Sequence, residues 1–312
     1  MVRKSTNLLL TKTLSGCLSA LIKKPNLGLL QLIQIAINTN YLEEASAYLE
    51  EYITRTIGYN YSNQLSSNNS LSTAGNESKP AAQNLFKLQG KSMFKDARAD
   101  AENQIYSQLN QKIDEFLELA SYDWLMGESS GIASSYITDL IAFLRSTFEA
   151  FTNLPAKVAQ TACHIACKHI ARSLMDFLLD DEVRCISLGA ISQLNLDILQ
   201  CEMFAGSEPV KGLEDGDLLL CFAELRQLID LFMDWDWSTY FADFGKQHSK
   251  YLRVKPNTAL NLLEKVREAE KKKNFIHSLK KNERDKKKLT ETVIKNLKQL
   301  IDEDRRGHTS SG

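Results

Sequence analysis

The sequence predicts an all-α protein. Only 14 of its 312 residues are Gly and 5 are Pro, while the helix-forming residues Leu, Ala, Lys, Glu and Gln are abundant, and this composition favours helices. No long alternation of apolar and polar residues occurs, and no Asn-Gly or Asp-Gly turn lies between apolar runs, so strand and hairpin signals are missing. Apolar residues recur instead three and four positions apart, as expected for helices that pack around a core.

The first helices are expected at 5–24, at 27–38 and from Asn40 onwards, with Asn40 as the N-cap of the third. Lys12 interrupts the apolar stretch of the first, which therefore predicts an amphipathic helix rather than a signal peptide. Residues 58–80 are rich in Ser and Asn. We expect them to form a mobile loop, because they cannot bury enough apolar surface to offset the entropy of ordering.

A long amphipathic helix is expected over about 90–121, and another over 133–151. The second ends before Pro155, since a residue that precedes proline disfavours the α conformation. We therefore predict two helical subdomains, 1–152 and 153–312. The apolar stripe of the long helix comprises Phe94, Ala97, Ala101, Ile105, Leu109, Ile113, Phe116 and Leu117.

The remaining helices are expected at about 155–180, 184–205, 216–235, 258–272 and 285–302. Short connections between them imply antiparallel neighbours. Pro256 marks the start of the fourth, with Asn257 or Thr258 as its cap. The last is expected to pack through a narrow apolar seam of Leu289, Val293, Leu297 and Leu300.

A pair of cysteines, Cys163 and Cys167, lies one helical turn apart beside His164 and His169, a spacing that could hold a metal ion. Both cysteines, however, continue an apolar stripe, and a tetrahedral site would need two more ligands from the same face. We therefore expect buried, reduced thiols and no metal. The stripe continues through Ile170, Leu174 and Phe177.

The run Asp234-Trp235-Asp236-Trp237 places carboxylates beside indoles. We interpret Asp236 as the cap of a short helical turn and both tryptophans as packing anchors, each with a partner for its indole N–H. The phosphate-binding Gly-rich loops, the nucleophile elbow and the zinc-protease motif are all missing from the sequence. We therefore expect that this chain itself binds no nucleotide, and we expect no cofactor.

The net charge of −1 hides an asymmetry, because residues 246–298 contain 17 Lys or Arg but only 6 Asp or Glu. Such a basic segment suits an acidic protein, an acidic membrane surface or nucleic acid, or is simply a set of solvated helix faces. Nucleic acid is the least suitable partner, since only Phe275 lies between the lysine runs 271–273 and 286–288, and no aromatic stacking platform results.

Three stretches carry a resemblance to a known family: the aromatic segment from Leu231 to Lys265, Phe-Leu-Arg-Ser-Thr-Phe at 143–148 and Leu-Pro-Ala-Lys-Val-Ala-Gln-Thr-Ala-Cys at 154–163. Together they resemble the C-terminal half of the Sec-fifteen subunit of the exocyst, which tethers secretory vesicles to the plasma membrane. The resemblance runs over essentially the whole chain. It implies a fragment of a longer subunit, preceded by a coiled-coil half, and two stacked helical bundles that form an elongated rod.

The same resemblance implies a non-enzymatic adaptor that binds a GTP-loaded Rab GTPase on secretory or recycling vesicles. Other exocyst subunits are the further partners, and the location is cytoplasmic, peripheral on vesicles and at plasma membrane sites of exocytosis. It leaves open whether a myosin tail shares the surface. The alternative function is a module that binds acidic phospholipid through the basic segment 246–298.

The resemblance places Rab binding in the C-terminal subdomain, where Asn274, Phe275 and Ile276 put an apolar pair inside a charged run, with Lys280 and Asn282 as polar rim. Alternatively, Phe275 and Ile276 pin a connector onto the core. The second candidates are Asn261 and Lys265, one turn apart on a helix face that we expect to be exposed.

Overall fold

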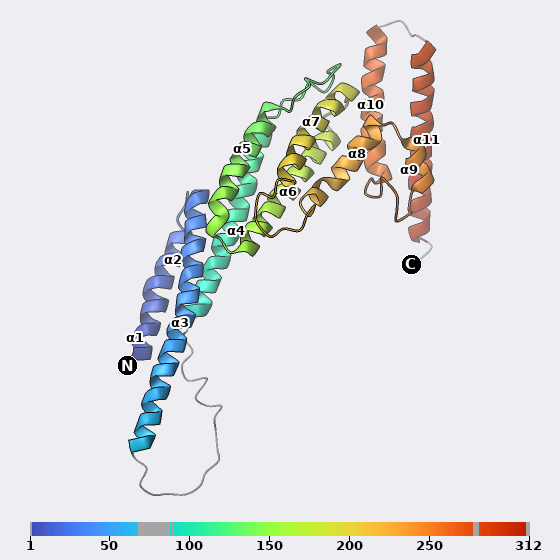
Figure 1. Cartoon of the computed structure of the whole chain (residues 1–312). Helices are drawn as coiled ribbons and strands as arrows, with labels where there is room; N and C mark the ends of the chain where they lie inside the picture. The colour runs from blue at the N-terminus through green and yellow to red at the C-terminus, as the bar shows by residue number, and fades with distance from the viewer. Residues whose placement is uncertain (1, 68–87, 89, 277–280, 310–312) are drawn as a thin grey trace. The chain divides into compact units, whose positions relative to one another are not determined.

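The computed structural model describes residues 2–67, 88, 90–276 and 281–309, and every regular element among them is a helix (Figure 1). The prediction of an all-α protein is confirmed. No helix within these residues is both long enough and apolar enough to span a bilayer. The Cα positions divide the chain into two compact units, Met1–Leu109 with Ala150–Ala159, and Asn110–Glu149 with Gln160–Gly312.

These units differ from the subdomains expected at 1–152 and 153–312, because residues 110–149 group with the second unit. The division passes through two continuous helices, α4 (Gly90–Leu117) and α6 (Ala156–Leu179). A continuous amphipathic helix gives no sign in its sequence that its two ends pack with different neighbours. Pro155 marks the end of a helix and not the end of a subdomain. Helix α5 (Ser135–Ala150) does end before it.

The first unit begins with a continuous helical run of α1 (Val2–Leu8), a π-helical stretch (Leu9–Ser15) and α2 (Gly16–Ile22). Asn26, with a φ of 66°, turns the chain into α3 (Leu29–Ser67), which lies alongside α1 and α2 (Figure 1). These elements form a small apolar core together with Leu88 and with Phe94 of α4, and its other members are Leu10, Leu14, Leu18 and Leu42.

Helix α3 corrects two predictions. It is one helix from Leu29 to Ser67, so the division into two helices with Asn40 as a cap was wrong. No Pro or Gly lies near Asn40 to interrupt the helix, and its side chain accepts a hydrogen bond from Arg98 at 2.7 Å instead. The expected loop at 58–80 also begins too early, because 58–67 continue α3, while 68–80 lie outside the described residues.

Helix α4 follows the predicted stripe closely, since all of the expected residues except Phe116 are buried. On its polar side, Gln104 donates to the carbonyl of Ile22 at 3.3 Å and Gln108 to that of Leu27 at 2.5 Å. These bonds satisfy carbonyls at the end of α2 and in the loop that follows, which have no helical partner.

The second unit contains α5 and most of α6, then α7 (Leu188–Ala205), α8 (Ala223–Met233), α9 (Trp237–Asp243), α10 (Pro256–Ile276) and α11 (Lys281–Thr309). The predicted helices match these within a few residues, apart from the short α9, the longer C-terminal helices and the helix predicted at 216–235, whose start is replaced by a 3-10 turn at Leu219–Phe222 before α8. Helix α10 starts at Pro256, so the caps predicted at Asn257 and Thr258 were wrong. Proline suits a first helical position, where no backbone donor is needed.

Candidate interaction surface

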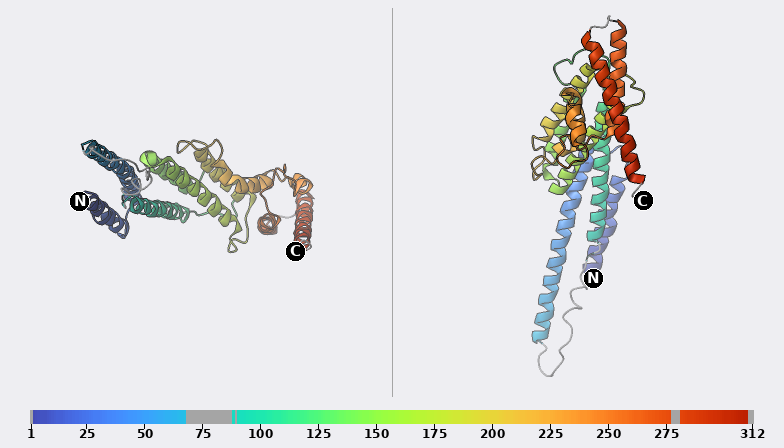
Figure 2. Two further views of the ribbon diagram at one scale, coloured as in Figure 1. Left: turned by 90° about the horizontal axis from the view of Figure 1, so that it is seen from below. Right: turned by 90° about the vertical axis from the view of Figure 1, so that its right-hand side faces the viewer.

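Four of the candidate Rab contacts lie at one end of a helical hairpin. Helices α10 and α11 run side by side and antiparallel (Figures 1 and 2). Residues 274–276 end α10 and Asn282 is the second residue of α11, so the backbone brings them to the same end, the hairpin tip. For these four residues the structure describes the backbone alone, and Lys280 lies outside the described residues.

The two helices of the hairpin are joined by an apolar seam and by ion pairs. Arg267 reaches Glu291 at 3.7 Å, and Lys298 reaches Glu264 at 2.9 Å. The predicted seam of α11 is wrong at one position, because Leu289 is 49% exposed. The helix is rotated slightly from the expected face, and its buried residues are Thr290, Val293, Ile294, Leu297 and Ile301.

Lys265 does not lie on an exposed face, which corrects our expectation. Only 7% of it is exposed, and its Nζ donates to the carbonyls of Leu178 at 2.8 Å and Asp180 at 2.7 Å. Burial lowers the pKa of this lysine, partly opposed by the carboxylates of Asp180 and Asp181. Lys265 therefore holds the end of α6 to α10, and its sequence spacing could not reveal this because both acceptors are backbone groups.

Asn261 is half-buried, and its Oδ1 is buried without a hydrogen-bond partner among the described residues. The structure therefore brings neither Asn261 nor Lys265 into the hairpin tip, which lies at the far end of α10.

A second candidate surface is the loop 118–134 between α4 and α5, which is held by polar residues of α7. Ser187, the N-cap of α7, donates its hydroxyl to the carbonyl of Met126 at 2.6 Å, and its N–H donates to Trp124 at 2.8 Å. Gln193 accepts from the N–H of Ser130 at 2.9 Å and donates to Ile132 at 2.8 Å. The loop is therefore attached to α7 at several points.

The deepest attachment is Asp197, which is fully buried. Its carboxylate accepts from the hydroxyl of Tyr122 at 2.5 Å, and from the N–H and hydroxyl of Ser134 at 2.6 and 2.8 Å. The hydroxyls of Tyr122 and Tyr136 are also hydrogen-bonded to each other. Because the Tyr122 proton goes to Asp197, Tyr136 is the donor in that pair. A buried carboxylate is tolerated when donors surround it in this way.

Burial raises the pKa of both tyrosines far above the usual value, and the nearby Asp197 carboxylate adds to the rise. Both therefore stay protonated and can keep donating throughout the physiological pH range. Gly189 completes the contact, because a Cβ there would lie 2.4 Å from the carbonyl oxygen of Met126.

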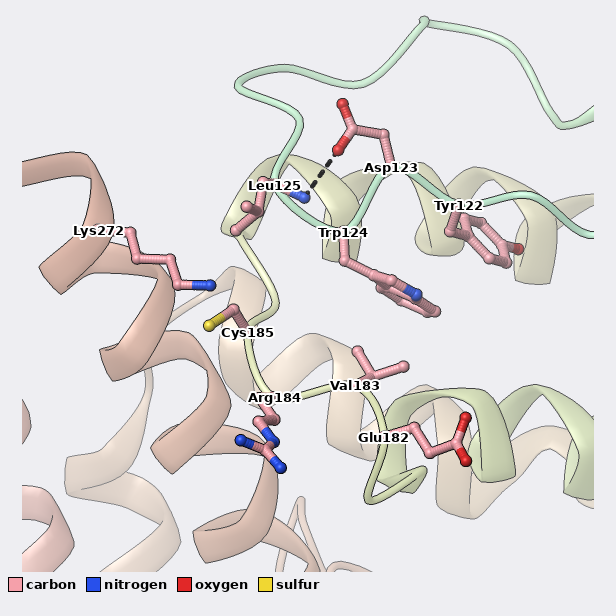
Figure 3. Close-up of a pocket in the computed structure, with 9 residues that line it drawn as sticks. All are labelled: Tyr122, Asp123, Trp124, Leu125, Glu182, Val183, Arg184, Cys185 and Lys272. Atoms are coloured by element: carbon pink, nitrogen blue, oxygen red, sulfur yellow. Dashed lines mark hydrogen bonds between the residues drawn. The ribbon is translucent and has the colours of Figure 1, made fainter.

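The ordered loop forms one wall of a cleft of about 440 Å³, and the segment 182–185 and helix α10 form the others (Figure 3). The indole of Trp124 lies against the ring of Tyr122, with 4.9 Å between centroids. Lys272 and Arg184 lie toward one side of the view in Figure 3 and Glu182 toward the other. The lining residues are Tyr122, Asp123, Trp124, Leu125, Glu182, Val183, Arg184, Cys185 and Lys272.

The cysteines of α6 are buried, as the apolar stripe predicted, since Cys163 and Cys167 are both 0% exposed. The hydrogen bond with Cys163, followed by burial, raises the pKa of Cys167, which favours its thiol form. His164 approaches Cys221 instead, at 3.8 Å. Among the described residues, no group of three or more His, Cys, Asp or Glu side chains is placed to hold a metal ion.

The aromatic segment bears out the capping prediction, because Asp236 caps α9 and accepts from the N–H of Thr239 at 3.4 Å. Trp237 is an anchor, 4% exposed, with its ring edge-on to that of Phe232 at 5.3 Å. The expected partner for its indole N–H is not found among the described residues, so that part of the prediction was wrong.

Sequence reasoning missed the polar residues of α7 that order the loop. The sequence does contain a sign of them, because Gln193 and Asp197 are polar residues four positions apart on an otherwise apolar stripe of α7. That stripe also contains Ala190, Leu194 and Cys201. Two polar residues within a buried stripe indicate a buried hydrogen-bond network, because isolated polar groups there would be costly.

Comparison with known proteins decides the family. Residues 1–265 match the family model described as "Exocyst complex subunit Sec15 C-terminal". The chain belongs to the Sec15 family of exocyst subunits. A crystal structure described as that of the Sec15 C-terminal domain is similar at a TM-score of 0.51 and 40% sequence identity, over 75% of this chain and 65% of that one.

Curated Sec15-family relatives agree with this assignment. Exocyst complex component 6 of Homo sapiens is 56% identical over 301 residues, and that of Drosophila melanogaster is 45% identical over 302 residues. The matched regions cover 96% and 97% of this chain but 35% and 36% of the relatives. The chain therefore spans about a third of the length of these Sec15-family proteins.

Proposed function

We propose that the chain is the C-terminal part of a non-enzymatic exocyst subunit that helps to tether vesicles to the plasma membrane. The observation that carries this proposal is the family match over residues 1–265. Other exocyst subunits are then its partners. Its place of action is the cytoplasmic side of vesicles and of plasma membrane sites of exocytosis.

We further propose that the hairpin tip recognises a Rab GTPase in its GTP state, on secretory or recycling vesicles. The tip suits such a partner because the backbone gathers Asn274, Phe275, Ile276 and Asn282 at one end of the hairpin, within a lysine-rich segment. A Rab presents ordered switch segments only with GTP, so an effector that contacts them binds one nucleotide state more tightly. A myosin tail is a further candidate partner for the same surface.

A titration calorimetry experiment tests the Rab proposal. The chain is titrated with a panel of Rab GTPases, each loaded with GDP or with a non-hydrolysable GTP analogue. We expect binding to one or two Rabs in the triphosphate state only. Replacing Asn274 and Phe275 by Ala should reduce the affinity at least tenfold, because the few hot-spot residues at the centre of an interface each cost about 2 kcal/mol or more when truncated.

The matched control is Gln299→Ala, an exposed residue of α11 away from the tip, which should leave affinity unchanged. Equal binding of the two nucleotide states, or full affinity in the Asn274 and Phe275 double variant, would contradict the proposal for the tip.

The second candidate function is binding of acidic phospholipid, and one observation favours it. Lys287, Lys288 and Lys295 of α11 are exposed and form no ion pair with any residue that the structure describes. Each such lysine contributes roughly 1 kcal/mol near an anionic membrane at low salt. We expect sedimentation with liposomes that contain phosphatidylserine, and loss of sedimentation when both Lys287 and Lys288 become Gln. Sedimentation with neutral liposomes would contradict this function.

A further inference from the structure

The cleft beside the loop 118–134 is lined by charged, aromatic and aliphatic side chains. The loop forms one wall of the cleft and is held to α7 by hydrogen bonds. These bonds do not bury its large apolar side chains, since Leu125 and Ile132 remain 50% and 73% exposed. A loop held rigidly while it presents apolar side chains to solvent is typical of binding sites.

Uncommitted hydrogen-bond donors surround the cleft. Arg184 and Lys272 are exposed, and neither forms a hydrogen bond or ion pair with a described residue. The indole N–H of Trp124 is likewise without a partner in the described part of the chain. The neighbouring lysine on α10, Lys271, differs in this respect, because it pairs with Glu268 at 2.7 Å. The donors of the cleft therefore remain available for an acceptor from outside.

The charges also limit what that acceptor can be. Asp123 and Glu182 line the same cleft, so its two cations are balanced by two carboxylates. Asp123 already accepts from the N–H of Leu125 at 3.0 Å, whereas the Glu182 carboxylate makes no hydrogen bond to a described residue. Because these two carboxylates offset the two cations, a second negative charge on a ligand gains no net Coulombic attraction in the cleft. A single carboxylate beside an apolar side chain meets both the cations and the Trp124 ring.

We propose that this cleft binds an extended peptide segment of a protein partner, in which one Glu or Asp stands next to a large apolar residue. The carboxylate pairs with Arg184 and Lys272, and the apolar side chain packs on Trp124 and Val183. This proposal goes beyond Rab recognition at the hairpin tip and does not depend on it.

The test uses the chain labelled with 5-fluorotryptophan, in which fluorine NMR resolves the three tryptophans. The ligands are blocked dodecapeptides with one common Gly-Ser background and the centres Glu-Leu-Gln, Gln-Leu-Gln, Glu-Ser-Gln or phosphoserine-Leu-Gln. We expect Glu-Leu-Gln to shift the Trp124 resonance alone, with Trp235 and Trp237 unmoved. The other three peptides should bind at least about threefold more weakly, because each loses a charge pair or the apolar contact or adds a second negative charge that gains no net attraction.

Variants of the cations complete the test. Arg184→Gln and Lys272→Gln should each weaken Glu-Leu-Gln binding about three- to tenfold, whereas Lys271→Gln should not change it. All three residues are exposed, so the thermal midpoints should stay the same. The proposal is overturned by a Trp124 resonance that no peptide shifts at millimolar concentration. Tighter binding of the phosphoserine peptide, or equal effects of Lys271→Gln and Lys272→Gln, overturns it as well.

Discussion

Two connecting segments of the second unit differ in the contacts that contribute most to their order. The polar-held loop, residues 118–134, is attached to α7 by Ser187, Gln193 and the buried Asp197. The aromatic-held segment, residues 234–255, is instead packed through rings, including Trp237 against Phe232 and Tyr240 at centroid distances of 5.3 and 5.9 Å. Both are fixed, but Leu125 and Ile132 of the first are exposed, whereas the main aromatic side chains of the second are buried and Leu252 is exposed there.

The difference teaches how a loop can be rigid without being buried. Hydrogen bonds fix the backbone of the polar-held loop, so Leu125 and Ile132 can face solvent. In the aromatic-held segment the side chains themselves provide the stability, so Trp237, Tyr240 and Tyr251 must be buried. A binding surface is therefore expected on the first segment and a structural role for the second.

Truncation within the aromatic-held segment should have the largest effect. We expect Trp237→Ala to lower the free energy of unfolding by about 4 kcal/mol, because it removes a large buried ring and leaves a cavity. Urea unfolding followed by circular dichroism measures the loss. Trp237→Phe should cost much less, since it keeps a ring and removes the unpartnered N–H. Equal losses for the two variants would mean that ring packing is not what orders the segment.

Removal of the buried carboxylate should come next. We expect Asp197→Ala to cost about 3 kcal/mol, because the hydroxyl of Tyr122 and two donors of Ser134 lose their acceptor. Asp197→Asn keeps one acceptor oxygen and should cost about half as much. Amide hydrogen exchange should speed up in the loop 118–134 and stay unchanged in 234–255. A loss below about 1 kcal/mol would show that the loop is held by apolar packing after all.

The close contact at Gly189 sharpens the comparison further. Gly189→Ala places a Cβ 2.4 Å from the Met126 carbonyl oxygen and 2.7 Å from Gly127, so the loop must move. We expect a loss of about 2 kcal/mol together with a change in the Trp124 fluorine resonance. Gly206→Ala is the matched control at the opposite end of the same helix, since its Cβ would meet nothing closer than 3.4 Å. An unchanged Trp124 signal in Gly189→Ala would argue against a contact that positions the loop.

The smallest effect is a pH dependence. Burial raises the pKa of Tyr122 in the folded state above its unfolded value near 10. The folded state thus holds this proton more tightly, and the resulting stability is fully present below about pH 10 and is lost as the pH rises beyond it. We expect Tyr122→Phe to flatten the fall in stability between pH 9 and 10.5 by about 0.8 kcal/mol. Tyr41→Phe, at an exposed position, should leave the pH profile unchanged.

Helix content and most helix boundaries could be predicted because they depend on local features. The stripe from Phe94 to Leu117 follows a period of 3.6 residues, and Pro155 and Pro256 mark boundaries by their own geometry. Where such local markers were misread, as at Asn40, the error was also local: a residue that can cap a helix can equally lie within one.

The candidate site could be predicted only in part. Sequence proximity suggested the run 274–282, and the antiparallel hairpin does bring its two ends together. The cleft could not be predicted, because it joins Trp124, Arg184 and Lys272 from three distant segments. Its ordering through Asp197 depends on donors more than 60 residues away.

The amino-acid sequence by itself determined that the chain is helical, where most of its helices begin and end, and that its last fifth is basic, since each of these follows from composition and short-range periodicity. Only the tertiary structure decided which polar residues are structural. Asp197 and Lys265 carry the same charges as many surface residues, and they are buried because backbone and hydroxyl partners from other elements meet them there. Such partners are defined by the packing of helices, which no local pattern encodes.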